Sequence, residues 1–244
     1  MKAVKTIGLS KLYGNRRAVD GLNFEIEQGE LYSILGVNGA GKTSLIKMLS
    51  CLSRPSEGEA LILGKSVKEQ SDEVKRLINL STQETAVALN LTVEENLRMI
   101  AEIYGMRADA ARRKTEEMIE ALSFEEYRSC RAKALSCGWR RKLSIAMALI
   151  SQPKILFLDE PTLGLDVLAR RELWKLIQTL KGKMTIILTT HYMEEAQALS
   201  DRIGIMHAGR IIASGTPEQL MISTNTPSIE QAFIELSGGG ADAG

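Results

Sequence analysis

Apolar and polar positions along the chain predict strands mixed with helices. Residues 3–9 and 22–28 alternate enough to suggest two strands, joined by a loop at residues 11–15. Later strand-length runs, most of them apolar, predict further strands at residues 31–35, 60–64, 78–82, 155–158 and 184–188. A hairpin is expected from residues 203–206 and 210–213, with its turn at residues 207–209.

Helical patterns fill the segments between these strands. Thr92 with Glu95 forms a capping box, and the run from Thr216 to Gln219 forms a second one with proline at the first helical position. Helices are expected at residues 44–49, 72–77, 92–104, 109–123, 140–150, 169–180 and 194–199, and from residue 216 onward.

This order predicts an α/β protein with an inserted helical lobe, because a charged, helix-forming block separates two sheet segments. Residues 237–244, rich in glycine, are expected to form a disordered tail. The expected boundaries are a sheet lobe at 1–86 and 153–220, a helical lobe at 87–152, and C-terminal helices at 216–236.

Composition narrows the class of protein. The 244 residues carry a formal net charge of +1, which argues against nucleic acid as a partner. Cys51, Cys130 and Cys137 form no C-x-x-C pair, so we expect a reducing compartment and no structural zinc. The N-terminus lacks the apolar core of a signal peptide, and no apolar run approaches the ~18 residues of a membrane span. The chain itself is expected to be cytosolic and soluble.

The strongest chemical signal is a phosphate-binding loop of the pattern G-x-x-x-x-G-K-[ST] at residues 36–43. An expected strand precedes it and an expected helix follows it, which is the context that the pattern requires. Glycines allow a nest of backbone N–H donors, and the helix adds the positive end of its dipole. Lys42 can reach the β- and γ-phosphates, and the Thr43 hydroxyl can bind Mg²⁺. A glycine-rich turn without a ligand is the structural alternative.

Two adjacent carboxylates, Asp159 and Glu160, end the buried strand at residues 155–158. A charge at the edge of an apolar layer is costly unless it meets a cation, and a phosphate-bound Mg²⁺ would be that cation. Asp159 would hold the metal, and Glu160 would orient and polarise the attacking water. A strand end that reaches solvent with ordinary acidic residues is the alternative.

Three further residues are site candidates by their position. Gln83 follows the strand at residues 78–82, and His191 follows another strand, where ligands bind in a parallel sheet. Tyr13 lies in a Gly/Asn turn, where it could stack on a nucleotide base or pack half-buried. His207 is interpreted as a turn residue.

These motifs, in this order, resemble the nucleotide-binding subunits of ATP-binding-cassette (ABC) transporters. The resemblance extends from Lys5 to about Leu236 and implies a P-loop NTPase of the ABC ATPase type, with a mixed sheet core and an N-terminal antiparallel β-subdomain. It assigns nucleotide binding to Tyr13, Asn38, Gly39, Ala40, Gly41, Lys42, Thr43, Ser44, Ser136 and Gly138. It assigns metal binding to Thr43, Gln83 and Asp159, and catalysis to Gln83, Glu160 and His191.

The signature motif, Leu135-Ser136-Cys137-Gly138-Trp139, departs from the family's Leu-Ser-Gly-Gly-Gln. Cys137 replaces the first glycine, and Trp139 replaces the glutamine. A Cβ at a position where glycine adopts a positive φ costs about 1–3 kcal/mol in backbone strain. We therefore expect Cys137 to leave the site working but slow. Val37, in place of a common proline, lies outside the fixed pattern.

The resemblance implies an ATP-hydrolysing motor subunit that uses ATP and Mg²⁺. Two copies, or one copy and a homologue, would close head to tail over two nucleotides. A separate transmembrane permease would dock near Gln83 and residues 84–105 and hold the chain on the cytoplasmic face of the membrane. Residues 189–196 and 227–233 resemble the branch that exports drugs, lipids, polyketides or sodium. The alternatives are a non-transport ABC ATPase that acts as a nucleotide switch, and a regulatory subunit with weak hydrolysis.

Overall fold

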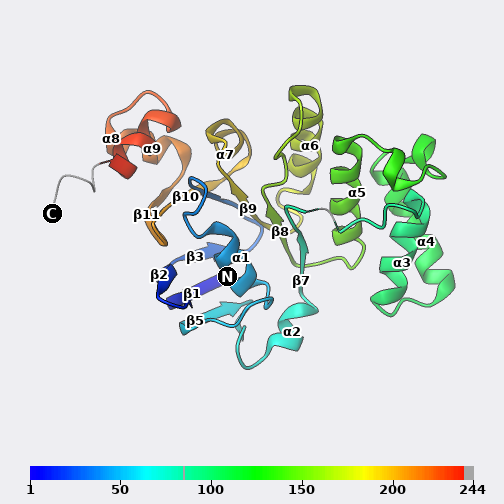
Figure 1. The fold of residues 1–244 in the computed structure, drawn as a ribbon, viewed down its shortest axis with the longest axis horizontal. Helices are drawn as coiled ribbons and strands as arrows, with labels where there is room; N and C mark the ends of the chain where they lie inside the picture. Colours follow the sequence, from blue (N-terminus) through cyan, green and yellow to red (C-terminus); the bar gives the residue numbers. More distant parts are fainter. Residues whose placement is uncertain (85, 239–244) are drawn as a thin grey trace.

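The protein contains two β-sheets, with helices along one side of the second sheet and a helical lobe at one end of the molecule (Figure 1). This architecture comes from a computed structural model, which describes residues 1–84 and 86–238. Ser237 and Gly238 belong to the last helix, α9 (Ile229–Gly238), so the expected start of a disordered tail at residue 237 is wrong. Residues 239–244 lie outside the described residues.

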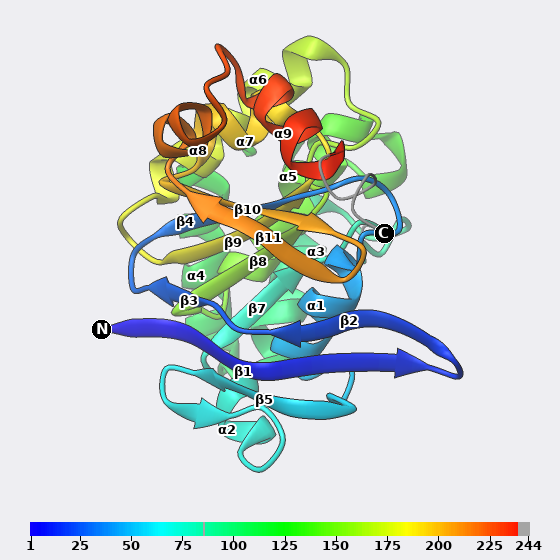
Figure 2. The ribbon, with the colours of Figure 1, turned by 90° about the vertical axis from the view of Figure 1, so that its left-hand side faces the viewer.

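The N-terminal sheet is antiparallel, as predicted. Figure 2 shows its strands below the second sheet. Among the described residues its order is β2-β1-β5-β6, and β3 also pairs with β1. Its strands are β1 (Lys2–Tyr13), β2 (Arg16–Leu22), β3 (Glu25–Glu27), β5 (Glu57–Ile62) and β6 (Lys65–Ser66).

The first hairpin differs from the prediction at two places. The loop expected at residues 11–15 is a two-residue turn, because Tyr13 already pairs with Arg16 and Gly14 supplies a positive φ of 56°. The strand expected at residues 22–28 is interrupted: Leu22 ends β2, and only Glu25–Glu27 form β3. Between them, the Asn23 side chain accepts the Gly8 N–H at 2.8 Å.

The second sheet is mixed, with the order β11-β10-β4-β9-β8-β7 within the described part of the chain. Neighbouring strands are parallel except for the β10–β11 hairpin, which confirms the predicted mixed core. The strands are β4 (Leu31–Leu35), β7 (Ile78–Ser81), β8 (Ile155–Asp159), β9 (Thr185–Thr190), β10 (Arg202–His207) and β11 (Arg210–Gly215).

The central strands of this sheet are buried on both faces, and their side chains alternate between two hydrophobic clusters. On β8, Ile155 and Phe157 pack with α1 (Lys42–Leu49) and the antiparallel sheet. Leu156 and Leu158 face the opposite cluster, which the helical lobe supplies. This alternation explains why the strand reads as a continuous apolar run.

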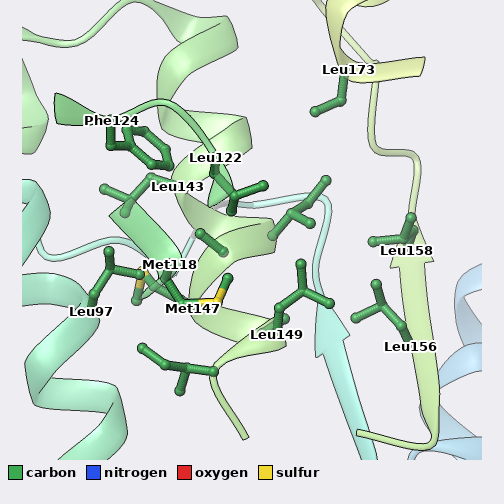
Figure 3. Packing of buried hydrophobic residues seen from close by; sticks show 14 of the residues in the cluster. Leu97, Met118, Leu122, Phe124, Leu143, Met147, Leu149, Leu156, Leu158 and Leu173 are labelled. Carbon is green, nitrogen blue, oxygen red and sulfur yellow. The ribbon is translucent and has the colours of Figure 1, made fainter. Parts of the chain in front are cut away.

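The helical lobe shares its core with the sheet. Figure 3 shows leucine and methionine side chains of α5 (Cys137–Leu149) between the other lobe helices and Leu156 and Leu158 of β8. The remaining lobe helices are α3 (Val93–Ile103) and α4 (Ala108–Ala121), with 3₁₀ turns at Glu125–Tyr127 and Ala132–Ala134. The predicted capping box that opens α3 is confirmed.

The other helices are α2 (Ser71–Lys75), α6 (Val167–Leu180), α7 (Met193–Leu199) and α8 (Pro217–Thr224). The capping box at Thr216 is confirmed, with Pro217 as the first residue of α8. In the described part of the chain, no helix is both long enough and apolar enough to span a membrane.

Candidate functional site

A pocket of about 600 Å³ opens where β4, β8 and β9 end. It brings together most of the site residues that the sequence predicts. Those lining it are Tyr13, Asn38, Gly39, Ala40, Gly41, Lys42, Thr43, Ser44, Gln83, Glu160 and His191. Asp159 contacts Thr43 beneath them, whereas Ser136 and Gly138 line a different pocket.

The loop between β4 and α1 accepts only glycine at two of its positions. A Cβ on Gly36 would lie 2.4 Å from the Met206 carbonyl oxygen. Gly41 has a φ of 108°, and a Cβ there would lie 2.3 Å from the Ala18 carbonyl oxygen. The first turn of α1 contains no acidic residue, and no side chain of the described residues caps it. Its N–H groups therefore fit the phosphate oxygens of a nucleotide.

Glu160 links the lysine of this loop to the histidine. Its Oε1 lies 3.0 Å from Lys42 Nζ, and its Oε2 lies 2.7 Å from His191 Nδ1. The Lys42 and Glu160 side chains are 5% and 7% exposed, so this ion pair is desolvated. Lys42 also donates to the carbonyl oxygen of Gly36 at 2.6 Å. Both carboxylate oxygens of Glu160 thus contact a protein nitrogen in this conformation.

The Glu160 backbone adopts a left-handed conformation, with a φ of 49°. Non-glycine residues rarely adopt this conformation, and it costs of order 1–3 kcal/mol. Thr189 holds it in place: the Glu160 N–H donates to the Thr189 carbonyl at 3.1 Å and to the Thr189 Oγ1 at 3.0 Å. The turn after β8 therefore directs a strained, buried carboxylate into the pocket.

The oxygen atoms around Asp159 fit a Mg²⁺ ion. Its Oδ1 accepts from Thr189 Oγ1 at 2.5 Å and lies 3.4 Å from Thr43 Oγ1. Gln83 lines the same pocket. Carboxylate, hydroxyl and amide oxygens are ligands that Mg²⁺ prefers, so Asp159, Thr43 and Gln83 are of the residue types that could hold the ion.

Arg141 of α5 supports Gln83 and was not predicted from the sequence. Its guanidinium donates to the carbonyl oxygens of Thr82 and Gln83, each at 2.7 Å. Burial lowers the pKa of Arg141. Because Gln83 lies 58 residues earlier in the chain, only the fold brings the two together.

The signature residues Ser136 and Gly138 line a separate pocket of about 230 Å³, beside α6. Within one chain the structure does not bring them to the phosphate loop. Ser136 Oγ accepts the Trp139 N–H at 3.3 Å, so α5 begins at Cys137 and not at the expected Arg140.

The prediction that Cys137 strains the backbone is wrong. Cys137 is the exposed first residue of α5, and its φ is not positive, so its Cβ costs no backbone strain. The next residue is the one that requires glycine, because a Cβ on Gly138 would lie 2.9 Å from the Ala169 Cβ of α6. The first glycine of the family motif is therefore replaceable here, and the second is not.

Trp139 packs into the helical lobe. Its ring centroid lies 4.2 Å from that of Tyr127 and 5.3 Å from that of Phe124. Lys142 Nζ lies 4.4 Å from the Trp139 ring centroid, a cation–π contact. The aromatic residue is partly buried and packs against the lobe at the position where the family has glutamine.

Arg16 and Ala18, which the sequence did not single out, also line the pocket at the phosphate loop, together with Leu163. The alternation of β2 places Arg16 and Ala18 on one face, a signal that becomes useful only once the hairpin is known. Tyr13 is 49% exposed at the pocket, and Lys11 Nζ lies 5.2 Å from its ring centroid.

Behind the pocket, Glu195 of α7 is completely buried. Its Oε1 accepts from Trp174 Nε1 at 2.9 Å, whereas its Oε2 has no hydrogen-bond partner among the described residues. Burial raises the pKa of Glu195, and nearby hydroxyl groups, including that of Thr190 next to His191, offset this only in part. The sequence pattern gave no sign of this buried carboxyl group.

Comparison with known proteins agrees with this geometry. The family model described as ABC transporter matches residues 19–163. The chain is 41% identical over 234 residues to the probable multidrug ABC transporter ATP-binding protein YbhF of Escherichia coli, covering 93% of this chain and 40% of YbhF. It is 41% identical over 223 residues to the daunorubicin/doxorubicin resistance ATP-binding protein DrrA of Streptomyces peucetius, covering 91% of this chain and 68% of DrrA.

A similar solved structure is a dimeric ATP-binding cassette in a post-hydrolysis state, bound to ADP and Pi. It has a TM-score of 0.78 and 26% identity, and the match covers 87% of this chain and 98% of that chain. The order of motifs, the two sheets with an inserted helical lobe, and these matches confirm the resemblance that the sequence indicated. The chain belongs to the ABC transporter family.

Proposed function

We propose that the chain binds ATP with Mg²⁺ in the pocket at the phosphate loop, hydrolyses it, and thereby powers export by a membrane transporter. The observation that carries the proposal is the Lys42–Glu160–His191 contact beside a loop whose glycines cannot be replaced. The names of the relatives YbhF and DrrA support export of drug-like molecules.

The residues have distinct roles in this proposal. The loop N–H groups and Lys42 would bind the β- and γ-phosphates, and Tyr13 would stack on the adenine. Thr43, Gln83 and Asp159 would hold Mg²⁺, which would neutralise charge on the phosphates. Glu160 would orient the attacking water and accept its proton.

The Lys42–Glu160 ion pair would explain why the nucleotide must bind before Glu160 can act as a base. While Lys42 contacts Glu160 Oε1, that oxygen is not free to accept a proton from water. A phosphate bound in the loop would attract the ammonium away from Glu160. His191 would remain hydrogen-bonded to Oε2 and hold the carboxylate in place. Binding of the nucleotide would therefore release the base.

A second copy, or a homologous subunit, would complete the site. Ser136 and Gly138 lie in a pocket apart from the phosphate loop, so in a head-to-tail pair they would reach the γ-phosphate of the partner's nucleotide. The similar cassette solved as a dimer supports this arrangement. ATP would close the pair, and hydrolysis would open it.

A separate transmembrane permease would dock beside the helical lobe. A groove of about 700 Å³ lies between the lobes, and Leu52 and Tyr104, both of which line it, are 62% and 46% exposed. Gln83 follows Thr82 of this groove and also lines the nucleotide pocket. A membrane partner bound there could sense the nucleotide, and it would place the chain on the cytoplasmic face of the membrane.

The test of the enzymatic proposal is the Glu160→Gln variant. It should keep its affinity for ATP and lose hydrolysis by about 100-fold or more, because the amide cannot accept a proton. Nucleotide binding and phosphate release are measured on the same preparation. As a matched control, Glu235→Gln, at an exposed position on α9 away from both pockets, should hydrolyse ATP at the wild-type rate. Wild-type turnover in folded Glu160→Gln would remove Glu160 from its role.

A further inference from the structure

Arg16 is an exposed cation beside the phosphate loop. It is the first residue of β2, opposite Tyr13 across the hairpin, and it lines the same pocket as Tyr13 and Gly39. Its Nη2 lies 3.7 Å from the position that a Cβ on Gly39 would occupy. A guanidinium at this place can reach a ligand that lies between the aromatic ring and the loop.

The alternation of β2 separates Arg16 from its neighbour Arg17. Arg17 has ionic partners: its Nη1 lies 2.9 Å from Glu57 and 3.2 Å from Asp20. For Arg16, no ion pair is present with any residue that the structure describes. The strand thus places one paired arginine outside the pocket and one without a carboxylate partner inside it.

Ala18 fixes the distance between this strand and the loop. Its carbonyl oxygen lies so close to Gly41 that any side chain at position 41 would clash with it. The strand β2 therefore packs directly against the loop backbone. Arg16 precedes Ala18 by two residues and shares its face. These backbone contacts therefore fix where the main chain of Arg16 lies relative to the loop.

We infer that Arg16 is a phosphate-binding residue of the nucleotide site. This inference rests on the proposed function, that is, on ATP as the ligand of the pocket. Guanidinium groups donate to phosphate oxygens in a planar fork, which gives a stronger and better oriented contact than an ammonium provides. Arg16 acts as a second cation, in addition to Lys42, at the Gly39 end of the loop.

The experiment compares nucleotides that differ in their phosphates. Affinities of ADP, AMP and adenosine are measured by competition against a fluorescent ADP analogue, for wild type and for Arg16→Gln, Arg16→Lys and Arg17→Gln. Because Arg16 is exposed, we expect Arg16→Gln to weaken ADP by about 3- to 10-fold and to leave adenosine unchanged. Arg16→Lys should recover part of the loss, and Arg17→Gln should bind ADP as wild type does.

Three outcomes would overturn the inference. Equal weakening of adenosine and ADP would mean that Arg16 acts on the base or through Tyr13. Unchanged ADP affinity in Arg16→Gln, together with a clear loss in Lys42→Ala, would reject Arg16 and leave the proposed function intact. No ADP binding by folded wild type would reject the proposed function itself, and the inference with it.

Discussion

The phosphate-loop pocket and the signature pocket differ in what one chain supplies. Around the phosphate loop, Glu160 lies within hydrogen-bonding distance of both Lys42 and His191. Around the signature motif, Ser136 caps α5, and Gly138 lies against α6. No residue of the phosphate loop lines this pocket. The first region is organised for a ligand by itself, whereas the second has a function in nucleotide chemistry only if another chain brings the ligand.

The largest expected effect falls on the phosphate-loop side. Lys42→Ala should weaken ADP binding by about 10- to 100-fold, because a charge-assisted contact to phosphate is lost. It should also destabilise the free protein by about 2–4 kcal/mol, because Glu160 remains buried without its cation. Denaturant unfolding without nucleotide measures the second effect.

A double variant provides the control for this prediction. Lys42→Ala combined with Glu160→Gln should recover most of the lost stability, since no buried charge remains, but should not recover ADP affinity. Equal stability of Lys42→Ala and wild type would show that the Lys42–Glu160 ion pair contributes nothing to the free protein.

A smaller effect is expected on the signature side. Ser136→Ala should reduce ATP turnover by about 10-fold and leave ADP affinity of the isolated chain unchanged, because in the proposed head-to-tail pair the hydroxyl would act on the partner's nucleotide. Loss of the cap should cost about 1 kcal/mol of stability. Ser136→Asp keeps a capping oxygen but adds a negative charge near phosphate, so it separates the two contributions. A fall in ADP affinity in Ser136→Ala would break the comparison.

Glu195 lies behind the first pocket and makes stability depend on pH. Because its pKa is raised in the folded protein, Glu195 keeps its proton at pH values where the unfolded chain has released it. The group therefore lowers the stability of the folded protein as pH rises above about 4.5, the ordinary pKa of a glutamate. Glu195→Gln should therefore gain stability relative to wild type as pH rises from about 4.5 toward neutrality. Glu195→Ala should be less stable than Glu195→Gln, because it leaves a cavity and the Trp174 indole without an acceptor. A stability difference between Glu195→Gln and wild type that does not change with pH would contradict the conclusion that the buried Glu195 carboxyl group holds a proton.

The smallest effect is expected at Cys137. Because its backbone is unstrained and its side chain is exposed, Cys137→Gly should change ATP turnover by less than about 2-fold. Gly138→Ala is the contrasting variant, since its Cβ would meet Ala169. A severalfold gain in turnover for Cys137→Gly would restore the idea that the cysteine slows the site.

The phosphate loop, the Asp159–Glu160 pair and His191 could be predicted because each is a short local pattern at the end of an apolar strand. The contacts that organise them could not, because they join distant segments. Arg141 holds Gln83, and Trp174 meets Glu195, only after the helices have packed against the sheet. Cys137 shows the opposite error: a family pattern suggested strain, but φ depends on where α5 begins.

The most direct test of the split site mixes two inactive variants. Lys42→Ala lacks a working phosphate loop, and Ser136→Asp lacks a working signature serine, so each alone should hydrolyse ATP slowly. In a mixed pair, one site would combine the intact loop of one chain with the intact signature of the other. The account predicts that ATP turnover of the mixture clearly exceeds the sum of the separate variants. Turnover equal to that sum, with mixed pairs shown to form, would contradict it.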